Sequence, residues 1–510
     1  MQFYNAAADL LDRNRHRMKP AVIDDRGSYS YAELADRADR FAGYLASLRL
    51  PVESRILLCL QDTINFPVAC LGAIKAGVVP VMVNPLLTSA DLSYMLEDSR
   101  ARLLVASSAA WSALAPVVGD KPHLGHLLIA DGDTPEGTIS FTVAVDAAPP
   151  MAEAAQTRAD EPCLWQYSSG TTGRPKGTIH SHHNVRKLME LYPRKILGLT
   201  EQDVTYSAAK LFFGYGFGNG LVFPFSVGAT AILMAGRPTP EEVWKRIRQH
   251  RPSVFYGVPT LYASLLDHPE AVSPEDLSVR ICTSAGEFLP RPLGERWQQR
   301  YGIDILDGIG STEMFHIFLT NRRDDLRYGT TGRPIDGYDL RLVDEDGLPV
   351  PTGEIGELHV KGPTSALGYW CNREKTQSTF LGDWTRTGDK FRLDPEGRYI
   401  FCGRSDDMLK VGGIYVSPLE VENALLSHPS VREAAVVGWV DDNGLIKPKA
   451  FLVLDESASP SADLQDELKA HVKSLLAPYK YPRWFEFIDA LPKTATGKIE
   501  RYKLKLCKKG

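Results

Sequence analysis

Short apolar runs and amphipathic segments alternate along the first four hundred positions of the chain. The runs RILLCL (55–60), VVPVMV (78–83) and RLLVA (102–106) are typical of buried strands. Residues 31–48 and 89–98 instead place their apolar side chains on one face, as amphipathic helices do. Strands that alternate with helices favour a mostly parallel sheet, so the pattern predicts an α/β fold.

The segment TPEEVWKRIRQHRP carries the signals that begin a helix. Thr239 can cap the helix, Pro240 suits its first turn, and Glu242 completes a capping box. Val243 and Ile247 then lie four positions apart on one face. The next run, SVFYGVP, predicts another buried strand.

The pattern changes after GRSDD. A second capping box, from Ser417 to Glu420, begins a helix that we expect to end near Leu426. The strands REAAVVGWV and KAFLVL follow, then a helix with Leu464, Leu468 and Val472 on one face, then the strand RWFEFI. This α+β pattern predicts a large N-terminal domain over residues 1–404 and a smaller C-terminal domain over 405–510.

Composition excludes several classes of protein. The 510 residues are 44% hydrophobic and 24% charged, as in an ordinary soluble protein, and a net charge of −5 disfavours a nucleic-acid partner. Residues 211–236 are uncharged, but GYGFGNG, Pro224 and Gly228 interrupt them, so we expect no membrane span. No secretory leader is visible, and the seven scattered cysteines include no CxxC pair, which favours a cytoplasmic location.

A glycine- and hydroxyl-rich loop, YSSGTTGRPKG, follows the predicted strand CLWQY. It does not match the G-x-x-x-x-G-K-[ST] or G-x-G-x-x-G patterns of other nucleotide sites. Glycines let backbone N–H groups approach anionic oxygens closely, and hydroxyls add further donors. The loop therefore predicts a phosphate site made by Ser168, Ser169, Gly170, Thr171, Thr172 and Lys176.

This loop resembles the phosphate loop of the adenylate-forming superfamily, which includes acyl-CoA synthetases, peptide-synthetase adenylation domains and luciferases. Four further blocks follow in the order found in that family: GSTE (310–313), TGD (387–389), GRSDDMLKVGG (403–413) and PKTATGK (492–498). The resemblance implies an AMP-forming acid–thiol ligase. In that reaction a carboxylate attacks the α-phosphate of ATP, releasing pyrophosphate, and the thiol of coenzyme A then displaces AMP.

The resemblance also implies roles for the residues that act on phosphate. Lys498 bridges the substrate carboxylate and the phosphate during adenylation, because a cation there offsets the repulsion between two anions. Lys176 holds the β- and γ-phosphates, with the hydroxyls of Thr171 and Thr172 as donors. Glu313 holds Mg²⁺, and Thr312 binds the α-phosphate.

Further residues fall where the family binds the nucleoside. Asp389 accepts hydrogen bonds from the ribose hydroxyls with the help of Arg404, and Gly286 and Glu287 line the adenine pocket. Many members stack an aromatic residue on adenine where this chain has Ile309, which can offer only apolar contact. We expect Asp307 to accept from the adenine amino group.

The small domain of the family moves between the two half-reactions. The resemblance places the pivot at Asp406, and it places Gly412 and Gly413 along the tunnel for the pantetheine arm of coenzyme A. An aspartate at such a position can also serve as a turn or helix cap.

The stretches KLFFGYGFGNG and DGIGSTEMFHIFLTN resemble the benzoate-CoA ligase subfamily. By this resemblance, Tyr215, His316 and Ile317 contact an aromatic ring and Phe213 lies near the carboxylate. No acid stands where amino-acid-activating relatives carry an aspartate. Gly214 leaves room beside the ring for an ortho substituent, as in 2-aminobenzoate, or else serves backbone geometry in a glycine-rich run.

The favoured function is thus an aryl-acid–CoA ligase that uses ATP, Mg²⁺ and coenzyme A on benzoate, 2-aminobenzoate or a hydroxybenzoate. Two alternatives stay open: an adenylating enzyme that loads a carrier protein, and a catalytically silent adenylate-binding protein. The retained Lys498, Lys176, Glu313 and Asp389 disfavour the silent protein. The oligomeric state, including a homodimer, is not determined by the sequence.

Overall fold

The computed structural model describes residues 3–168, 174–405, 407–411, 414–441, 445–477, 480–493 and 499–506. The chain divides into two compact units. The first contains Met1–Tyr328, Pro334–Asp339 and Val360–Thr385, and the second contains Gly329–Arg333, Leu340–His359 and Arg386–Gly510. The domain boundary between residues 404 and 405 stays a prediction.

The first unit contains an eight-stranded sheet in the order β19-β9-β8-β4-β3-β5-β6-β7, which is parallel from β8 to β7. Its strands are β3 (Arg55–Cys59), β4 (Val79–Met82), β5 (Leu103–Ser107), β6 (His126–Ala130), β7 (Ile139–Ser140), β8 (Pro162–Ser168), β9 (Lys176–Ser181) and β19 (Gly368–Tyr369). Leu92 and Leu114, from two helices on one face, pack onto Leu57 and Leu104 in its core. The predicted strands at 55–60, 78–83 and 102–106 are confirmed as β3, β4 and β5.

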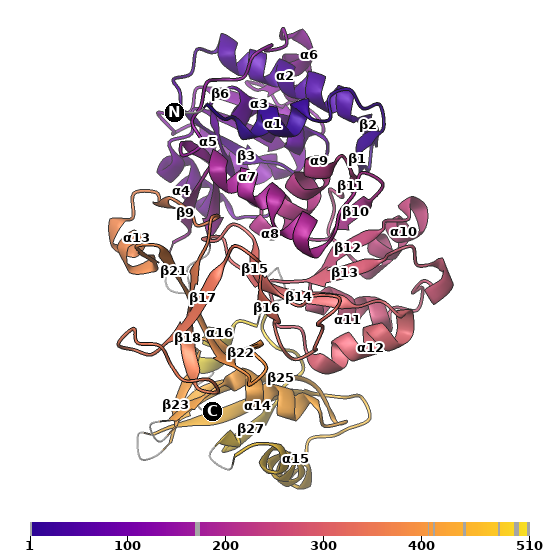
Figure 1. Ribbon diagram of the computed structural model, residues 1–510, viewed down its shortest axis with the longest axis vertical. Coiled ribbons are helices and arrows are strands. Elements are labelled where there is room, and N and C mark those ends of the chain that lie inside the picture. Colours follow the sequence, from indigo (N-terminus) through magenta and orange to yellow (C-terminus); the bar gives the residue numbers. More distant parts are fainter. Residues whose placement is uncertain are drawn as a thin grey trace. The chain divides into compact units, whose positions relative to one another are not determined.

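The helices of this part of the chain lie beside the sheet in Figure 1. They are α1 (Ala6–Asp12), α2 (Tyr31–Ser47), α3 (Asn65–Lys75), α4 (Ser89–Ser99), η1 (Ser108–Ala110), α5 (Trp111–Val118), α6 (Phe141–Ala147), α7 (His182–Glu190) and the π-helical η2 (Tyr192–Ile196).

A nine-stranded sheet, in the order β16-β15-β14-β13-β12-β10-β11-β1-β2, completes the core of the first unit. Its strands are β1 (Pro20–Asp24), β2 (Gly27–Ser30), β10 (Val204–Ser207), β11 (Thr230–Ile232), β12 (Val254–Gly257), β13 (Ile281–Ser284), β14 (Ile305–Gly310), β15 (Ile317–Thr320) and β16 (Arg333–Pro334). From β1 to β14 the neighbouring strands are parallel, which confirms the predicted fold class.

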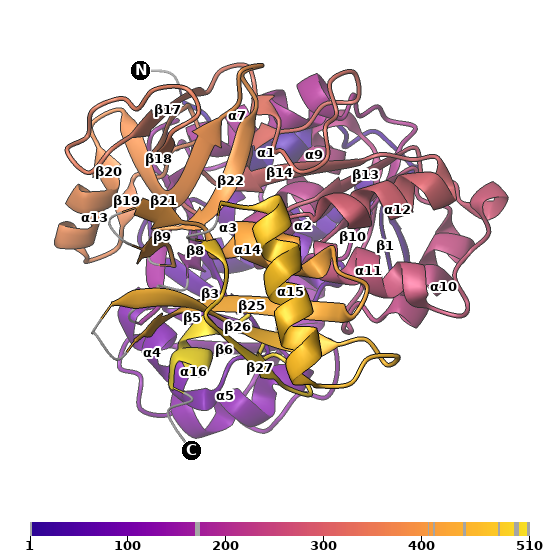
Figure 2. The same ribbon diagram turned by 90° about the horizontal axis from the view of Figure 1, so that it is seen from below.

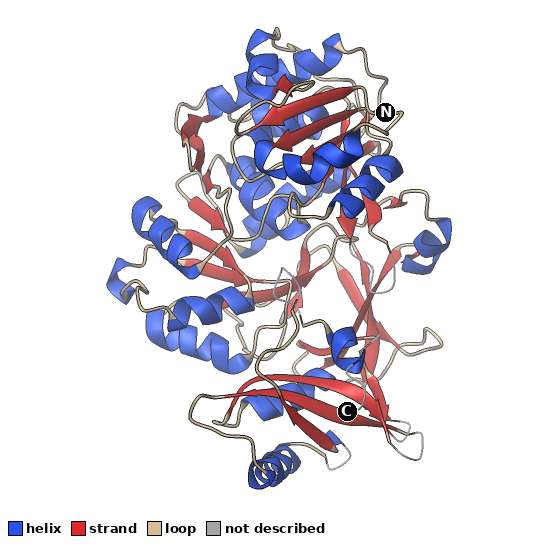
Figure 3. Cartoon of the chain, turned by 180° about the vertical axis from the view of Figure 1, so that it is seen from behind, coloured by secondary structure: helices blue, strands red, loops and turns tan. Residues whose placement is uncertain are grey.

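The helices of this region are α8 (Gly214–Phe217), the π-helical η3 (Gly218–Val222), α9 (Phe223–Val227), α10 (Pro240–His250), α11 (Pro259–Asp267), η4 (Pro274–Asp276) and α12 (Arg291–Tyr301). Helix α13 (Arg373–Thr379) instead contacts β19 and β20 (Phe380–Leu381). Helices α10, α11 and α12 lie beside this sheet (Figures 1 and 3). Their side chains form one apolar cluster, in which the indole rings of Trp244 and Trp297 stack 6.3 Å apart. The uncharged segment 211–236 contains α8, η3, α9 and β11. Among the residues that the structure describes, no helix has the length and apolar character needed to cross a membrane.

The remaining strands form three smaller sheets, in the orders β17-β18-β21-β20 with β22 beside β21, β23-β24 and β25-β26-β27. These strands, with the helices of the second unit, are β17 (Asp339–Val343), β18 (Ile355–Lys361), β20 (Phe380–Leu381), β21 (Trp384–Leu393), β22 (Tyr399–Arg404), β23 (Leu409–Val411), β24 (Ile414–Val416), α14 (Pro418–Leu426), β25 (Val431–Val440), β26 (Ile446–Leu454), α15 (Ala462–Leu475), β27 (Trp484–Phe487) and α16 (Arg501–Leu506). Helices α14 and α15 lie against the three-stranded sheet in Figure 2. Their Leu425 and Leu468 belong to one apolar cluster with Val436 and Leu452 of its strands. This agrees with the predicted α+β pattern.

Both predicted capping boxes form only in part. The hydroxyls of Thr239 and Ser417 accept the expected backbone N–H bonds at the starts of α10 and α14. The glutamates bind cations instead: Glu242 pairs with Arg246 at 2.6 Å, and Glu420 pairs with Lys480 at 2.6 Å. An ammonium or guanidinium attracts a carboxylate more strongly than a neutral backbone N–H does, so the reciprocal half of each box is lost.

Candidate functional site

The predicted phosphate loop connects two antiparallel strands of the eight-stranded sheet. Ser168 ends β8 and lies opposite Lys176, which begins β9. The hydroxyl of Tyr167 donates to Asp98 at 2.7 Å, and that of Tyr94 donates to the carbonyl of Pro175 at 3.1 Å. Both stems of the loop are therefore anchored. The predicted donors Ser169, Gly170, Thr171 and Thr172 lie outside the described residues.

Glu313 lies at the mouth of this hairpin. Its Oε1 accepts a hydrogen bond of 2.7 Å from the hydroxyl of Tyr369 and one of 3.4 Å from Ser168. The ammonium of Lys176 lies 4.7 Å from the centroid of the Tyr369 ring, a cation–π contact. The fold thus brings a carboxylate, an ammonium and two hydroxyls together from three distant parts of the chain.

This arrangement suits Mg²⁺ bound together with phosphate. Within the described part of the chain, no three histidine, cysteine, aspartate or glutamate side chains gather as they would around a metal ion. Mg²⁺ commonly takes one or two carboxylates and completes its shell with phosphate oxygens and water. Glu313 therefore fits the predicted role as the protein ligand.

The turn that carries Thr312 and Glu313 is held by a buried histidine that the sequence analysis did not single out. Nε2 of His180 lies 2.8 Å from the carbonyl oxygen of Thr312, and its ring stacks on Phe315 at 4.1 Å. Burial lowers the pKa of His180 to about 4, so the ring is neutral and Nε2–H donates to the carbonyl. Phe315 adopts a φ of +68°, and the turn packs tightly around it.

The predicted adenine residues lie on β14 and just after β13. The carboxyl group of Asp307 is buried, and Ser284 and the backbone of Gly308 offer it hydrogen bonds. Burial raises the pKa of Asp307 well above its usual range. Glu287 accepts a hydrogen bond of 2.7 Å from Thr260, beside Gly286 at φ +88°. Ile309 is partly buried on β14.

The predicted ring contacts belong to a cluster of aromatic side chains around His316, which we call the aromatic cluster. The imidazole of His316 is 2% exposed, and its centroid lies 4.6 Å from that of Phe223, 5.5 Å from Tyr192 and 5.6 Å from Tyr215. Burial lowers the pKa of His316 to about 3, so it is an uncharged wall at neutral pH. Ile317 is also buried, whereas Phe213 is 39% exposed and packs on the ring of Phe212.

The structure favours the backbone explanation for Gly214. A Cβ atom on Gly214 would lie 2.6 Å from the carbonyl oxygen of Phe315 and 3.2 Å from Oε1 of Gln166. The protein itself occupies the space in that direction. The role of Gly214 beside an ortho substituent stays a prediction, for which these contacts offer no support.

We predict that Gly214→Ala lowers activity with benzoate and with 2-aminobenzoate alike, by about ten- to a hundredfold, because it displaces the turn at Phe315. Gly119→Ala is the matched control, since a Cβ there meets nothing within 4 Å. Pyrophosphate exchange with each acid measures the effect. A selective loss with 2-aminobenzoate would support the substituent explanation.

Two of the predicted residues in the second unit form an ion pair. Nη1 of Arg404 lies 2.7 Å from Oδ1 of Asp389, and these residues face each other across the paired strands β21 and β22. The predicted pivot Asp406, the tunnel residues Gly412 and Gly413, and the catalytic Lys498 lie outside the described residues. All of the assigned site roles stay predictions.

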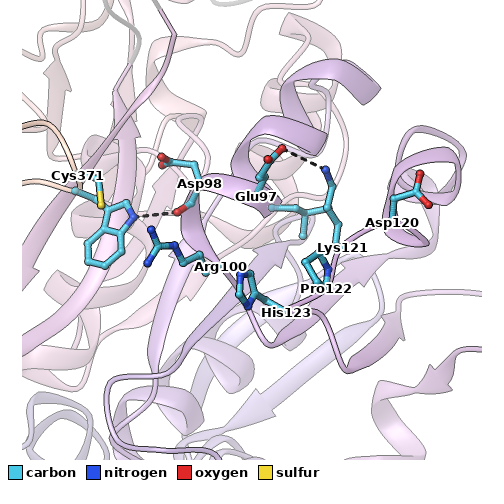
Figure 4. Close-up of a pocket in the computed structure, with 10 residues that line it drawn as sticks. Glu97, Asp98, Arg100, Asp120, Lys121, Pro122, His123 and Cys371 are labelled. Carbon is cyan, nitrogen blue, oxygen red and sulfur yellow. Dashed lines mark hydrogen bonds and ion pairs between the residues drawn. The ribbon is translucent and has the colours of Figure 1, made fainter.

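A cavity of about 390 Å³ lies between the end of α4 and residues 120–123, with Trp370 and Cys371 also in its lining (Figure 4). Its walls carry Glu97, Asp98 and Asp120 together with Arg100, Lys121 and His123. The charges of opposite sign nearly balance, and Lys121 pairs with Glu97 at 3.7 Å. Such a lining is unsuited to an apolar ring.

Family models and known proteins match this chain over most of its length. Residues 11–370 match the family model described as "AMP-binding enzyme", and residues 420–498 match "AMP-binding enzyme C-terminal domain". The chain is 56% identical to a benzoate–CoA ligase of Thauera aromatica over 507 residues, which cover 98% of this chain and 96% of that protein.

Two further relatives extend this likeness. A 4-hydroxybenzoate–CoA/benzoate–CoA ligase of Rhodopseudomonas palustris is 49% identical, with 98% of this chain and 94% of that protein covered. The crystal structure of a benzoate CoA ligase from Burkholderia xenovorans superposes with a TM-score of 0.92 at 53% identity, covering 98% of this chain and 99% of that one. The chain therefore belongs to the family of AMP-binding enzymes, the adenylate-forming superfamily that its phosphate loop indicated.

Proposed function

We propose that this protein is an aryl-acid–CoA ligase. It adenylates a benzoate-type carboxylate with ATP, releasing pyrophosphate, and then forms the thioester of coenzyme A, releasing AMP. One observation carries the proposal. A single turn places Glu313 at the phosphate hairpin and, three residues later, His316 in the aromatic cluster. This turn would therefore connect the phosphate site to the site for the aromatic ring of the acid.

The family uses ATP, Mg²⁺ and coenzyme A, and the residues of this chain fit them. Lys176 and Ser168 would bind phosphate oxygens, while Glu313 would hold Mg²⁺, which, when bound, offsets the negative charge of the phosphates. His180 keeps the Thr312 turn in place through its carbonyl, so that Thr312 can meet the α-phosphate. Lys498 would place its ammonium group between the carboxylate of the acid and the α-phosphate of ATP, and so offset the repulsion between these anions.

The aromatic cluster would determine which carboxylic acids bind. The rings of Tyr192, Tyr215 and Phe223 surround the neutral imidazole of His316, and none of these four side chains carries a charge that could pair with a substrate ammonium group. A flat aromatic acid suits such surroundings better than an amino acid does. Free coenzyme A is the proposed acceptor, because the relatives at 56% and 49% identity are CoA ligases.

Pyrophosphate exchange followed by thioester detection tests this function. We expect exchange with benzoate in the presence of ATP and Mg²⁺, and benzoyl-CoA when coenzyme A is added. Phenylalanine and hexanoate serve as matched acids, one with an ammonium group and one without a ring, and we expect about tenfold less activity or worse. Exchange without turnover of coenzyme A would point to a carrier protein, and no exchange with any acid would contradict the proposal.

A further inference from the structure

A buried carboxylate outside the site described so far holds the segment that leads into α8. Asp62 lies between β3 and α3 and is 3% exposed. Both of its oxygens lie 3.2 Å from the backbone nitrogen of Leu211, 149 positions further along the chain. Burial raises the pKa of Asp62 to about 6, because water no longer solvates the charge. The fold therefore tolerates the neutral form of this side chain better than the charged form.

The segment that Asp62 holds, residues 208–213, connects β10 to α8 and is anchored at other points as well. The backbone N–H of Ala208 donates to the carbonyl of Tyr256 at 2.9 Å, and the ammonium of Lys210 donates to a carbonyl of the loop after β11, at Gly236, at 2.6 Å. The hydrogen bond from the buried carboxylate lies nearer to α8 along the chain than either of these anchors. It therefore fixes the part of the segment that enters the helix.

Helix α8 packs directly on the backbone of this segment. A Cβ on Gly216 would lie 2.1 Å from the carbonyl oxygen of Lys210 and 2.5 Å from that of Ala209. The neighbouring residue on the helix is Tyr215, whose ring lies in the aromatic cluster, 5.6 Å from that of His316. Closely packed interiors transmit displacements, so a shift of the segment would move Tyr215 as well.

We propose that Asp62 is a positioning residue for the carboxylic acid. By accepting the N–H of Leu211, it fixes the segment 208–213 and, through α8, the place of the Tyr215 ring, on which the affinity for the acid depends. In this role Asp62 acts through Leu211 and does not contact the acid. The inference rests on the proposed function, since it assumes that Tyr215 lies beside the ring of the acid.

The strength of this contact depends on the charge of Asp62. A carboxylate accepts an N–H more strongly than a neutral carboxyl group does. The ammonium of Lys210 partly offsets the effect of burial on the pKa of Asp62, and Asp25 and Arg246 act in opposite directions on the pKa of Lys210. Asp62 takes up a proton as the pH falls through about 6, and the hydrogen bond from Leu211 then weakens. The affinity for the acid should therefore fall over the same range of pH.

Asp62→Asn tests this role because it removes the charge and keeps an oxygen that accepts the N–H of Leu211. Pyrophosphate exchange from about pH 5 to about pH 8 gives the KM values for benzoate and for ATP. At the upper end we expect the KM for benzoate to rise about three- to tenfold, with little change in the KM for ATP. The difference from the wild-type protein should shrink as the pH falls through about 6, because both side chains are then neutral. Asp62→Leu removes the acceptor and should raise the KM for benzoate about thirtyfold or more.

Thermal unfolding separates positioning from folding. The folded protein holds the pKa of Asp62 above its ordinary value, so the ionised carboxylate lowers stability at pH values above about 6. Asp62→Asn should therefore unfold at the same temperature as the wild-type protein or higher, even though it binds benzoate less tightly, and it decides the question if Asp62→Leu does not fold. Asp203→Asn is the matched control: this buried carboxylate also accepts a backbone N–H, from Thr200 at 2.8 Å, but it precedes β10, and its loss should leave the KM for benzoate unchanged.

Two results would overturn the role of Asp62. One is a KM for benzoate that Asp62→Asn leaves unchanged at every pH, and the other is an equal rise in the KM values for benzoate and ATP. Failure of the wild-type protein to use benzoate would instead overturn the proposed function, and this is seen before any variant is compared.

Discussion

Lys498→Ala is expected to lower the rate of adenylate formation by about a thousandfold or more. A single charge about 4 Å from the reacting oxygens is worth about 4 kcal/mol at an effective dielectric constant near 20. That energy corresponds to about three orders of magnitude in rate. The acid and the triphosphate are both anions, so the cation acts mainly in the first half-reaction. Benzoate-dependent pyrophosphate exchange measures this loss.

Lys498→Ala should affect thioester formation, the second half-reaction, far less than adenylate formation. When the acyl adenylate is supplied, the variant should still form the thioester with coenzyme A at close to the normal rate, because one of the two anions is already bonded. Lys505→Ala, a change in the same basic C-terminal segment, should leave both half-reactions intact. Equal losses in both half-reactions would contradict the assigned role.

Glu313→Gln should lower pyrophosphate exchange by about a hundredfold and raise the Mg²⁺ concentration needed for half-maximal rate. The amide can keep the hydrogen bonds from Tyr369 and Ser168, since its oxygen accepts as the carboxylate does. The variant thus removes the charge and preserves the position. A titration of Mg²⁺ at saturating benzoate and ATP separates the two effects.

Tyr369→Phe is the matched control for Glu313→Gln. It removes the 2.7 Å hydrogen bond to Glu313 but leaves the carboxylate and the ring beneath Lys176. We expect a loss of only about fivefold, from the single hydrogen bond, with little change in the Mg²⁺ requirement. If Glu313→Gln also left the Mg²⁺ requirement unchanged, the residue would act on something other than the metal.

The site could be predicted only in part from the sequence. Ser168, Lys176 and Glu313 belong to short motifs, and the structure brings them together. Tyr369 and His180 belong to none of the recognised blocks, although one holds Glu313 and the other holds the turn before it. No local sequence pattern marks either residue. His180 lies in HSHHN and Tyr369 in GYW, and neither stretch indicates which distant residue the side chain contacts.

Gly214 and Glu420 show why reasoning from neighbours along the chain fails at particular positions. The carbonyl of Phe315, about a hundred residues away along the chain, occupies the space beside Gly214. Glu420 turns from its own helix N-terminus to Lys480, a pairing 60 residues apart. A stronger or bulkier partner from a distant segment overrides the local preference in both cases.

By itself the sequence determined the alternation of strands and helices and the α/β class, and it predicted the phosphate loop. These depend on periodicities and spacings within a few residues, which a single stretch of chain contains. Only the tertiary structure decided that Ser168 and Tyr369 reach the same carboxylate, from 145 and 56 positions away. Hydrogen bonds and burial between distant segments depend on how the sheets pack, and no local pattern records that packing.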